Sequence, residues 1–498
     1  MIEQRVCDQI TFRELDAMSG KDFFAGEAIP HGADPNTDPY HLDVSAIREP
    51  PRTLRGALPY LGPGFILSAS IVGSGELIAT TIVGAKAGFV LMWFIIFSCL
   101  IKVAVQIEFG KHAISSGEST MAALNNLPGP RLWNAHWSIW TWLLLMALKM
   151  LQVGGILGGV VLALEEFFPS LRETPVHVIT AYAVAASVSL LVFRGHYLLI
   201  EKASLLMIGA FTLFTLASVC VLQTTDLAIS RGEFVSGLIP NIPAEAAILL
   251  VAIGAFGITG VGGDEIMAYN YWLLEKGYAR YTGPRDDSAQ WETRAKGWIR
   301  VMYWDATLAM LAYTAMTVMF YLLGAAILNR QGLVPEDTQL IATLGNMYTQ
   351  SLGPWARTVY VIGAVVVLYS TMFAALAAWT RMFSDAFSRV GLYRFENERS
   401  RLWWIGLLAW VIPFVWATLF LLTGKPALMV ILGGIATVVI LLIVVFAAIF
   451  FRYRKLDQRL LPTRFYDATL WVSAIAIIVV AAFLAFQTAN LAFQTVTK

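Results

Sequence analysis

Charged residues are scarce in this chain. Only 14% of its 498 residues are charged, against about 25% in soluble domains, which excludes an ordinary soluble protein. The 35 basic and 34 acidic residues leave no basic field of the kind that nucleic-acid binding needs, so nucleic acid is excluded as a partner. The three cysteines, Cys7, Cys99 and Cys220, form no CxxC pair, and neither a disulfide framework nor a thiolate metal site is indicated.

Motifs for catalysis are also missing. The sequence contains no nucleophile-base constellation, phosphate-binding loop or metal motif. None of its six histidines lies deep inside an apolar run, so a histidine metal site has little support. We therefore expect no enzymatic activity and no cofactor.

Hydrophobic residues dominate instead: they make up 57% of the chain, and the mean hydropathy is +0.66. A helix needs about 20 apolar residues to cross a bilayer, and eleven windows approach or exceed that length. They fall at residues 59–83, 88–110, 138–163, 176–193, 203–222, 245–275, 300–328, 355–380, 402–423, 427–451 and 466–490. The pattern predicts an all-α, multi-pass membrane protein. A polar, Pro- and Asp-rich arm over residues 1–58 precedes the first window, and we expect it to be cytoplasmic and partly disordered.

Lys and Arg residues are distributed unevenly between the loops that join these windows. With the N-terminus in the cytoplasm, and with the N-terminal arm counted only from Arg48 onward, the inside segments hold 23 Lys and Arg residues and the outside segments hold 7. Because cytoplasmic loops are enriched in positive residues, we expect the N-terminus inside and, after eleven spans, the C-terminus outside. The arm contains no apolar stretch of a secretory signal, and the expected location is a cell membrane of the prokaryotic inner-membrane type.

The windows divide into two sets of five and a final single one. The expected units are a first repeat over residues 59–222, a second over 223–451, and a loop with the eleventh helix over 452–498. Five helices repeated once place the second set upside down relative to the first, as in many secondary transporters.

The first window of each set combines clustered glycines with carboxylates. The first carries Gly73-Ser74-Gly75-Glu76, and the sixth carries glycines from Gly257 to Gly263 followed by Asp264 and Glu265. Unwound backbone within a membrane is tolerated only where it lines a cavity or is buried in protein, so we expect both helices to be broken around a central site. The alternative is that the glycines serve only close helix packing.

Several short motifs occur in an order known from one transporter family. They are Gly62-Pro63-Gly64-Phe65, Gly84-Ala85, Gly88-Phe89, Gly117, Arg194-Gly195, Ile200-Glu201-Lys202, Asp305 and Leu352-Gly353-Pro354-Trp355-Ala356. On these residues the chain resembles the NRAMP family of divalent-metal transporters over most of residues 60–450. The resemblance implies the LeuT-type fold of two inverted five-helix repeats plus extra helices. It also implies a transported divalent cation as the ligand.

The site motifs of that family are changed here. The family has Asp-Pro-Gly-Asn in the first helix, where this chain has Gly73-Ser74-Gly75-Glu76. It has Met-Pro-His in the sixth helix, where Gly262-Gly263-Asp264 stand, followed by Glu265. Without the thioether and the imidazole, the expected metal ligands are the carboxylates of Glu76, Asp264 and Glu265, and carboxylates suit magnesium, calcium and manganese. In this respect the chain is similar to NRAMP-related magnesium transporters.

The third window carries Lys149 and Gln152 where many family members have acidic residues on a proton route. The two residues are three apart and therefore share a helix face. A lysine in mid-membrane is costly and usually faces a cavity or a counter-ion, so we expect Lys149 to pair with Asp264, Glu265 or Glu76. A proton relay of the family type is then not expected.

The remaining candidates each have two interpretations. Glu76 either contacts the substrate or only caps a helix, and Gly73 beside it belongs to the same break. Asp264 and Glu265 point in different directions in a regular helix, and we expect Asp264 to be the one that faces the site.

Two further polar residues are equally open. Thr259 offers an oxygen to the site, as Gln152 does, although buried hydroxyl and amide groups often close a hydrogen bond between helices instead. Asp305 is expected to open the seventh helix near the cytoplasm, as a gate or as an interfacial carboxylate.

Two functions fit these features. The first is a transporter of a hard divalent cation, magnesium first and then manganese or calcium, that works by alternating access without proton coupling. It is favoured because several carboxylates in a low-dielectric site cannot all stay ionised without a cation. The alternative is a symporter of a small organic solute such as an amino acid or amine, in which Lys149 replaces the coupling cation. The expected partners are the transported ion or solute and the lipid bilayer, and a monomer is compatible with the sequence.

Overall fold

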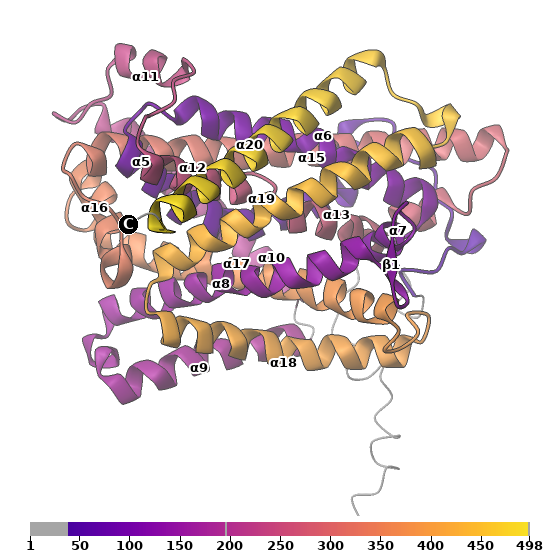
Figure 1. Ribbon diagram of the computed structural model, residues 1–498, viewed down its shortest axis with the longest axis horizontal. Helices are drawn as coiled ribbons and strands as arrows, with labels where there is room; N and C mark the ends of the chain where they lie inside the picture. The colour runs from indigo at the N-terminus through magenta and orange to yellow at the C-terminus, as the bar shows by residue number, and fades with distance from the viewer. Residues whose placement is uncertain (1–37, 195–196, 497–498) are drawn as a thin grey trace, which may run out of the picture.

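The protein is a bundle of long helices (Figure 1). The computed structural model describes residues 38–194 and 197–496. Each of the eleven predicted spans coincides with a helix or a set of consecutive helices in this part of the chain. Within the described residues, nine helices are long and apolar enough to cross a membrane, or ten if the bent pair at the first span counts as one. The first half holds α4 (Pro63–Ile71) continued by η3 (Val72–Thr80) and α5 (Thr81–Ala87), then α6 (Met92–Ser116), α8 (Trp137–Phe167), α9 (Thr174–Phe193) and α10 (Tyr197–Leu222). The second half holds α12 (Ala246–Ile258) with α13 (Gly263–Lys276), then α15 (Ala289–Leu323) continued by η5 (Gly324–Asn329), α17 (Ala356–Val390), α18 (Glu398–Thr423) and α19 (Pro426–Phe450) continued by η7 (Phe451–Lys455), and finally α20 (Arg464–Val496).

Shorter elements connect the long helices. They are η1 (Val44–Ala46), α3 (Leu54–Ala57), η2 (Leu58–Tyr60), α7 (Thr120–Asn125), the antiparallel strands β1 (Arg131–Leu132) and β2 (Ala135–His136), η4 (Pro169–Arg172), α11 (Arg231–Leu238), α14 (Tyr278–Thr282), η6 (Asp337–Gln339), α16 (Leu340–Leu352) and η8 (Gln458–Leu460). Polar side chains begin several helices. Ser119, Ser288 and Asn397 accept hydrogen bonds from backbone N–H groups in the first turns of α7, α15 and α18, which satisfies donors that the helices themselves leave open.

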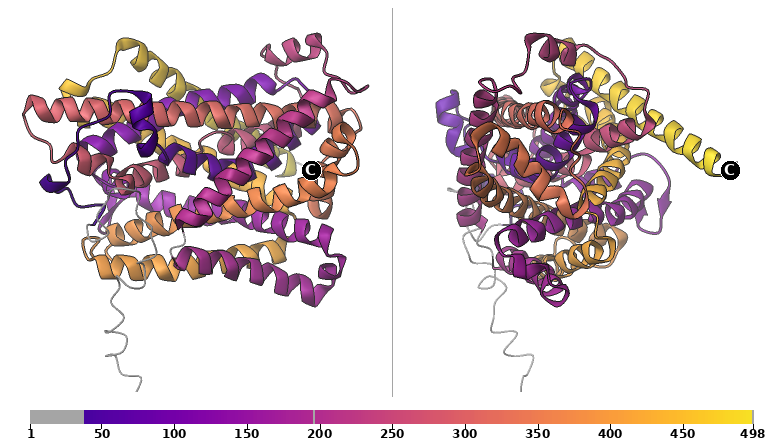
Figure 2. Two further views of the ribbon diagram at one scale, coloured as in Figure 1. Left: turned by 180° about the vertical axis from the view of Figure 1, so that it is seen from behind. Right: turned by 90° about the vertical axis from the view of Figure 1, so that its left-hand side faces the viewer.

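Helices of the two halves pack against each other. α8 of the first half lies against α17, α18 and α19 of the second, and α6 lies against α15. α9 and α18 form a pair at one edge of the bundle (Figure 1), and only 28% of the apolar window of α9 is buried, against 72% of that of α8. α20 lies outside the bundle against α6 and α19, and its C-terminal end projects from it (Figure 2). The inner helices α4, α6, α8, α13, α15 and α17 therefore surround the region where the two breaks lie.

The first predicted break is a bend within continuous helical backbone. α4 and the helical stretch Gly75–Ala87 are inclined by 43°. The segment η3, which contains this bend, is π-helical. The bend packs closely against neighbouring segments, and only glycine leaves room for this. A Cβ on Gly73 would lie 2.4 Å from the Thr371 Oγ1, and one on Gly75 would lie 2.5 Å from the Ile258 carbonyl oxygen. π-Helical segments inside α-helices are common at functional sites.

The second break interrupts the helix completely. α12 ends at Ile258 and α13 begins at Gly263, with Gly260 between them at a φ of +63°. A Cβ on Gly260 would lie 2.9 Å from the Cys99 Cα of α6. Both the left-handed backbone and the close approach to α6 therefore require glycine.

The described part of the N-terminal arm, which begins at residue 38, contacts the bundle. The Tyr40 hydroxyl donates a hydrogen bond to Glu275 at 2.7 Å, and the Trp298 indole N–H donates one to the Arg48 carbonyl at 3.1 Å. Leu42 fills the space beside Gly117, where an added Cβ would meet its side chain at 2.9 Å. Contacts of the partly buried Tyr40 and Leu42 thus hold this part of the arm against the bundle, and partial disorder of the arm over residues 1–58 stays a prediction. Residues 1–37 lie outside the described part.

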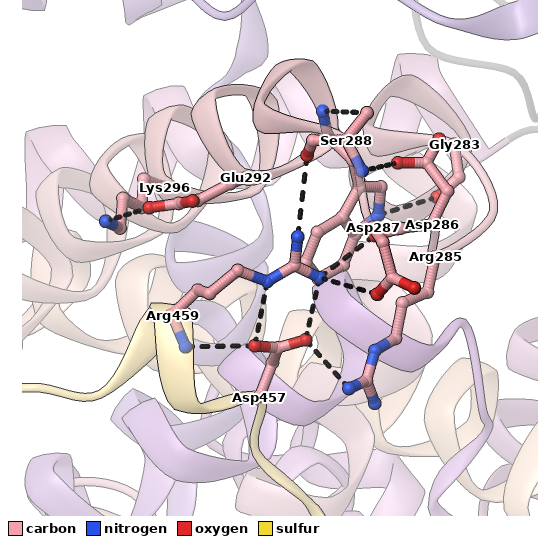
Figure 3. Close-up of polar contacts among 10 residues, drawn as sticks. Gly283, Arg285, Asp286, Asp287, Ser288, Glu292, Lys296, Asp457 and Arg459 are labelled. Atoms are coloured by element: carbon pink, nitrogen blue, oxygen red, sulfur yellow. Dashed lines mark hydrogen bonds and ion pairs between the residues drawn. The ribbon is translucent and has the colours of Figure 1, made fainter.

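The loop between α19 and α20 is fixed to the loop between α14 and α15 (Figure 3). The Asp457 carboxylate accepts hydrogen bonds from the Arg459 guanidinium at 3.0 and 3.1 Å and forms an ion pair with Arg285 at 2.8 Å. Arg459 also donates to the Asp286 carbonyl at 2.9 Å and lies 5.0 Å from the centre of the Trp291 ring. The hydrogen bonds from Arg459 lower the pKa of Asp457 to about 2.

We expect Asp457→Asn to destabilise the protein by about 1.5 kcal/mol at pH 7, a typical value for hydrogen bonds to a charged group. The pKa of Asp457 is lower in the folded than in the unfolded protein, so its contribution is complete above about pH 5, falls as the pH passes the unfolded pKa of about 4, and is lost as the pH falls through about 2. The difference in melting temperature between wild type and variant, measured from pH 8 to pH 3, should stay constant down to about pH 5 and then shrink. Asp287→Asn is the matched control, because Asp287 is fully exposed and 4.0 Å from Arg459. A difference that grows on acidification would contradict this assignment.

Candidate functional site

A small cavity of about 10 Å³ lies beside the break of the sixth helix. It has room for about one water molecule. Its lining consists of Ile66, Leu67 and Ser70 of α4, Asp264, Glu265, Ala268 and Trp272 of α13, and Ala374, Ala375, Ala378 and Trp379 of α17. Two carboxylates therefore face a space that is otherwise made of alanines, aliphatic side chains, two tryptophans and one serine, and this lining contains no methionine, histidine or cysteine.

Asp264 stands in the first turn of α13 and is almost completely buried, at 3% exposure. One of its oxygens accepts a hydrogen bond from the Lys149 ammonium of α8, and the other accepts one from the Trp379 indole N–H at 2.9 Å. The start of a helix also favours negative charge. The pairing between Lys149 and Asp264 follows the expectation that a lysine in mid-membrane needs a counter-ion.

Glu265 faces the same cavity as Asp264. Its Oε2 lies 3.6 Å from the Lys149 Nζ, and this oxygen has no hydrogen-bond partner within the described residues. The expectation that only Asp264 faces the site is therefore wrong. Because Gly262 has no side chain, the Glu265 carboxylate turns back into the space where a Cβ would meet it at 2.3 Å.

Glu76 does not join these two carboxylates. Its Oε1 accepts hydrogen bonds from the Gly260 N–H at 3.1 Å and from the Thr317 hydroxyl at 2.6 Å, so it links η3 to the break of the sixth helix and to α15. Among the described residues, no three His, Cys, Asp or Glu side chains converge on one point. In this conformation the structure therefore brings together only two of the three predicted ligands, and the set of Glu76, Asp264 and Glu265 stays a prediction.

The other predicted site residues serve contacts between helices. The Gly73 N–H donates to the Thr371 hydroxyl at 3.0 Å, and the Thr259 hydroxyl shares a 3.0 Å hydrogen bond with Ser98. Gln152 is buried beside Gly433 of α19, where a Cβ would lie 2.4 Å from the Gln152 Cβ. None of these three residues lines the cavity.

Asp305 lies well inside α15 and is completely buried. It accepts hydrogen bonds from the Gly62 N–H at 2.9 Å, the Gly64 N–H at 2.6 Å and the Tyr269 hydroxyl at 3.0 Å. Asp305 does not open the seventh helix as predicted, because α15 begins sixteen residues earlier. Asp305 instead caps the start of α4 and connects it to α13.

Sequence reasoning missed a second buried lysine at the break. Lys102 of α6 is completely buried, and its Nζ lies 2.6 Å from the Phe256 carbonyl oxygen and 2.5 Å from that of Thr259. The sequence does contain a signal for this residue, because Lys102 is a charged residue in the middle of the apolar run of the second span, as Lys149 is in the third. Trp379 was missed as well, and a tryptophan in an apolar helix gives no such signal.

Solved structures share this fold. A crystal structure of the Eremococcus coleocola manganese transporter superposes with a TM-score of 0.62 at 16% identity, covering 91% of this chain and 92% of that one. The transporter MhsT in complex with L-phenylalanine superposes with a TM-score of 0.56 at 14% identity, covering 87% and 99%. These likenesses concern the fold alone, and they confirm the predicted LeuT-type arrangement of two inverted five-helix repeats.

Sequence comparison identifies the family. The divalent metal cation transporter MntH of Bacillus subtilis is 24% identical over 322 residues, which cover 63% of this chain and 68% of that protein. MntH of Yersinia enterocolitica is 26% identical over 345 residues, covering 68% and 75%. A family model described as natural resistance-associated macrophage protein-like, or Nramp, matches residues 64–487. The chain is thus a multi-pass membrane protein that belongs to the Nramp family of transporters.

Proposed function

We propose that this protein transports a hard divalent cation, magnesium first and then manganese or calcium, through the cavity that Asp264 and Glu265 line. One observation carries the proposal: two buried carboxylates at the start of α13 face a cavity whose lining has no thioether, imidazole or thiol. Carboxylate, carbonyl and water oxygens suit magnesium, calcium and manganese, whereas sulfur and imidazole ligands favour the later transition metals.

Two carboxylates are enough for magnesium. This ion dehydrates reluctantly, keeps several waters and is usually bound through one or two carboxylates. When both carboxylates are ionised, Asp264, Glu265 and Lys149 give the cluster a net charge of −1, which attracts a divalent cation. The cation takes the place of the Lys149 ammonium, which must move away from Asp264.

The membrane potential provides sufficient driving force without protons. A divalent ion gains about 4.6 kcal/mol from a potential of about 100 mV, which supports an accumulation of about a thousand-fold at equilibrium. α4 and α13, which line the cavity and are tied together by Asp305, are the segments that we expect to move during alternating access. In the orientation that we propose, the N-terminus is cytoplasmic.

The test is uptake into proteoliposomes that hold the purified protein under an inside-negative potential. Indicators for magnesium and manganese report metal entry, and a pH probe reports the lumen. We expect magnesium entry that increases with the potential while the lumenal pH stays constant. Acidification in step with metal entry would contradict the uncoupled mechanism.

Liposomes without protein and the variant Glu166→Gln are the controls, because Glu166 pairs with Arg172 and Arg357 away from the cavity. If folded, monodisperse protein admits no divalent ion, the metal proposal is abandoned. Amino acids and amines are then screened as competitors in the same liposomes.

A further inference from the structure

Lys102 places a positive charge at the break of the sixth helix, apart from the pair of Lys149 and Asp264. The side chain is completely buried between α6 and α12. Its Nζ lies 2.6 Å from the Phe256 carbonyl oxygen, 2.5 Å from the Thr259 carbonyl oxygen and 5.0 Å from the centre of the Phe256 ring. The ammonium is thus held by two carbonyl oxygens and the face of an aromatic ring.

These carbonyls are those of an interrupted helix. α12 ends at Ile258, so the last carbonyls of this half-helix lack partners within the helix and carry the negative end of its dipole. In transporters with broken helices, such carbonyl groups coordinate a monovalent cation. Ser98 adds a hydroxyl 3.1 Å from the Phe256 carbonyl oxygen and 3.0 Å from the Thr259 hydroxyl. The oxygen cluster has the chemistry of a cation site, and Lys102 occupies it.

A carboxylate lies at the same break. Glu76 accepts a hydrogen bond from the Gly260 N–H at 3.1 Å, directly after Thr259, whose carbonyl oxygen lies 2.5 Å from the Lys102 Nζ. The Glu76 Oε2 is buried and has no hydrogen-bond partner within the described residues. Removal of the Lys102 ammonium would therefore leave two carbonyls and a carboxylate without a cation in a low-dielectric environment, which is strongly unfavourable.

We propose that Lys102 is a tethered ammonium that permanently fills a monovalent-cation site at the end of α12, so that the protein needs no dissolved sodium or potassium at this position. This inference rests on the proposed transport function only because it states that the transport cycle requires no dissolved sodium or potassium at this position. Its test measures protein stability, so it can fail or succeed whether or not magnesium is transported.

The experiment compares melting temperatures of purified wild type, Lys102→Met and Lys102→Gln in sodium, potassium and N-methyl-D-glucamine chloride at equal ionic strength. A ligand that binds only the folded state raises its stability with concentration. We expect sodium to raise the melting temperature of both variants by about 3 °C over N-methyl-D-glucamine and to leave wild type unchanged. The matched control is Gln106→Met, because Gln106 is buried one turn further along α6 and carries no charge.

Several outcomes decide the proposal. A folded Lys102→Met or Lys102→Gln whose melting temperature is the same in all three salts overturns it, as does a Gln106→Met that responds to sodium equally. If both Lys102 variants are recovered folded only when sodium is present throughout purification, the proposal is supported. If neither variant folds in any salt, wild type decides: a melting temperature that rises with sodium overturns the proposal, and one that is the same in all three salts supports it.

Discussion

Asp264→Asn should reduce the initial rate of divalent-cation uptake at least about 100-fold. Asp264 supplies one of the two carboxylates that line the cavity, and it is hydrogen bonded to Lys149 and Trp379. Removing one partner of the buried charge pair that this carboxylate forms with the transported cation costs about 2 to 5 kcal/mol, and about 2.8 kcal/mol corresponds to 100-fold. The measurement is uptake into proteoliposomes that contain equal amounts of folded protein, with Glu166→Gln as the control.

The same substitution should also destabilise the protein, because Lys149 then keeps a buried charge with only Glu265 nearby, at 3.6 Å. The expected loss is about 3 to 5 kcal/mol. The double variant Asp264→Asn with Lys149→Met removes both charges, and replacing a buried pair in this way is often neutral or stabilising. We expect it to recover the melting temperature of wild type without recovering uptake. Recovery of uptake as well would show that the pair is only structural.

The fold follows from hydropathy to an unusual extent. In a bilayer every backbone polar group must be satisfied internally, so an apolar run of the right length has to be a helix. The window at 427–451 corresponds to α19, Pro426–Phe450, and the window at 176–193 to α9, Thr174–Phe193. Windows describe only the apolar part, however, and α17 continues from the predicted end at 380 to Val390 with polar residues.

The form of the breaks was less accessible from the sequence. Glycines clustered beside carboxylates in both halves, but a π-helical bend at Gly73 and a complete interruption at Gly260 give the same composition. The difference depends on neighbours far apart in the chain. Gly73 is fitted against Thr371 and Gly260 against Cys99, and these contacts have no sequence signal.

The candidate site could be predicted only where the cost of burial dictates a partner. A buried lysine needs a counter-ion, and that rule identified Asp264 and Glu265 as candidates for Lys149. It does not distinguish among several carboxylates, so Glu76 was assigned to the same group although Gly260 and Thr317 hold it elsewhere. Backbone carbonyl oxygens can also accept the hydrogen bonds of a buried lysine, as they do for Lys102. Every residue has a backbone carbonyl, so the sequence does not show which of them a lysine contacts.

Asp305→Ala should open the cavity by releasing α4. Asp305 accepts three hydrogen bonds, from the N–H groups of Gly62 and Gly64 at the start of α4 and from Tyr269 of α13. Gly62 provides no side-chain cap for α4, so without Asp305 the first N–H groups of this helix have no acceptor from α15. Hydrogen bonds to a charged group contribute about 1.5 to 3 kcal/mol each, and a loss of about 2.8 kcal/mol shifts an open-closed equilibrium about 100-fold.

The shift is measured at Ser70, which lies on α4 and lines the cavity. Ser70→Cys is combined with Cys7→Ser and Cys220→Ser. The rate at which a water-soluble thiol reagent modifies the new cysteine is then measured with and without Asp305→Ala. Cys99 remains as an internal reference, since it is completely buried against Gly260. In Asp305→Ala we expect the modification rate of the cysteine at position 70 to rise about 100-fold, while the modification rate of Cys99 is unchanged. In Asp305→Asn, which keeps one acceptor oxygen, we expect a rate at position 70 between those of the Asp305 protein and Asp305→Ala. Equal acceleration at both cysteines would indicate general unfolding, and none at either would show that Asp305 does not hold α4 closed.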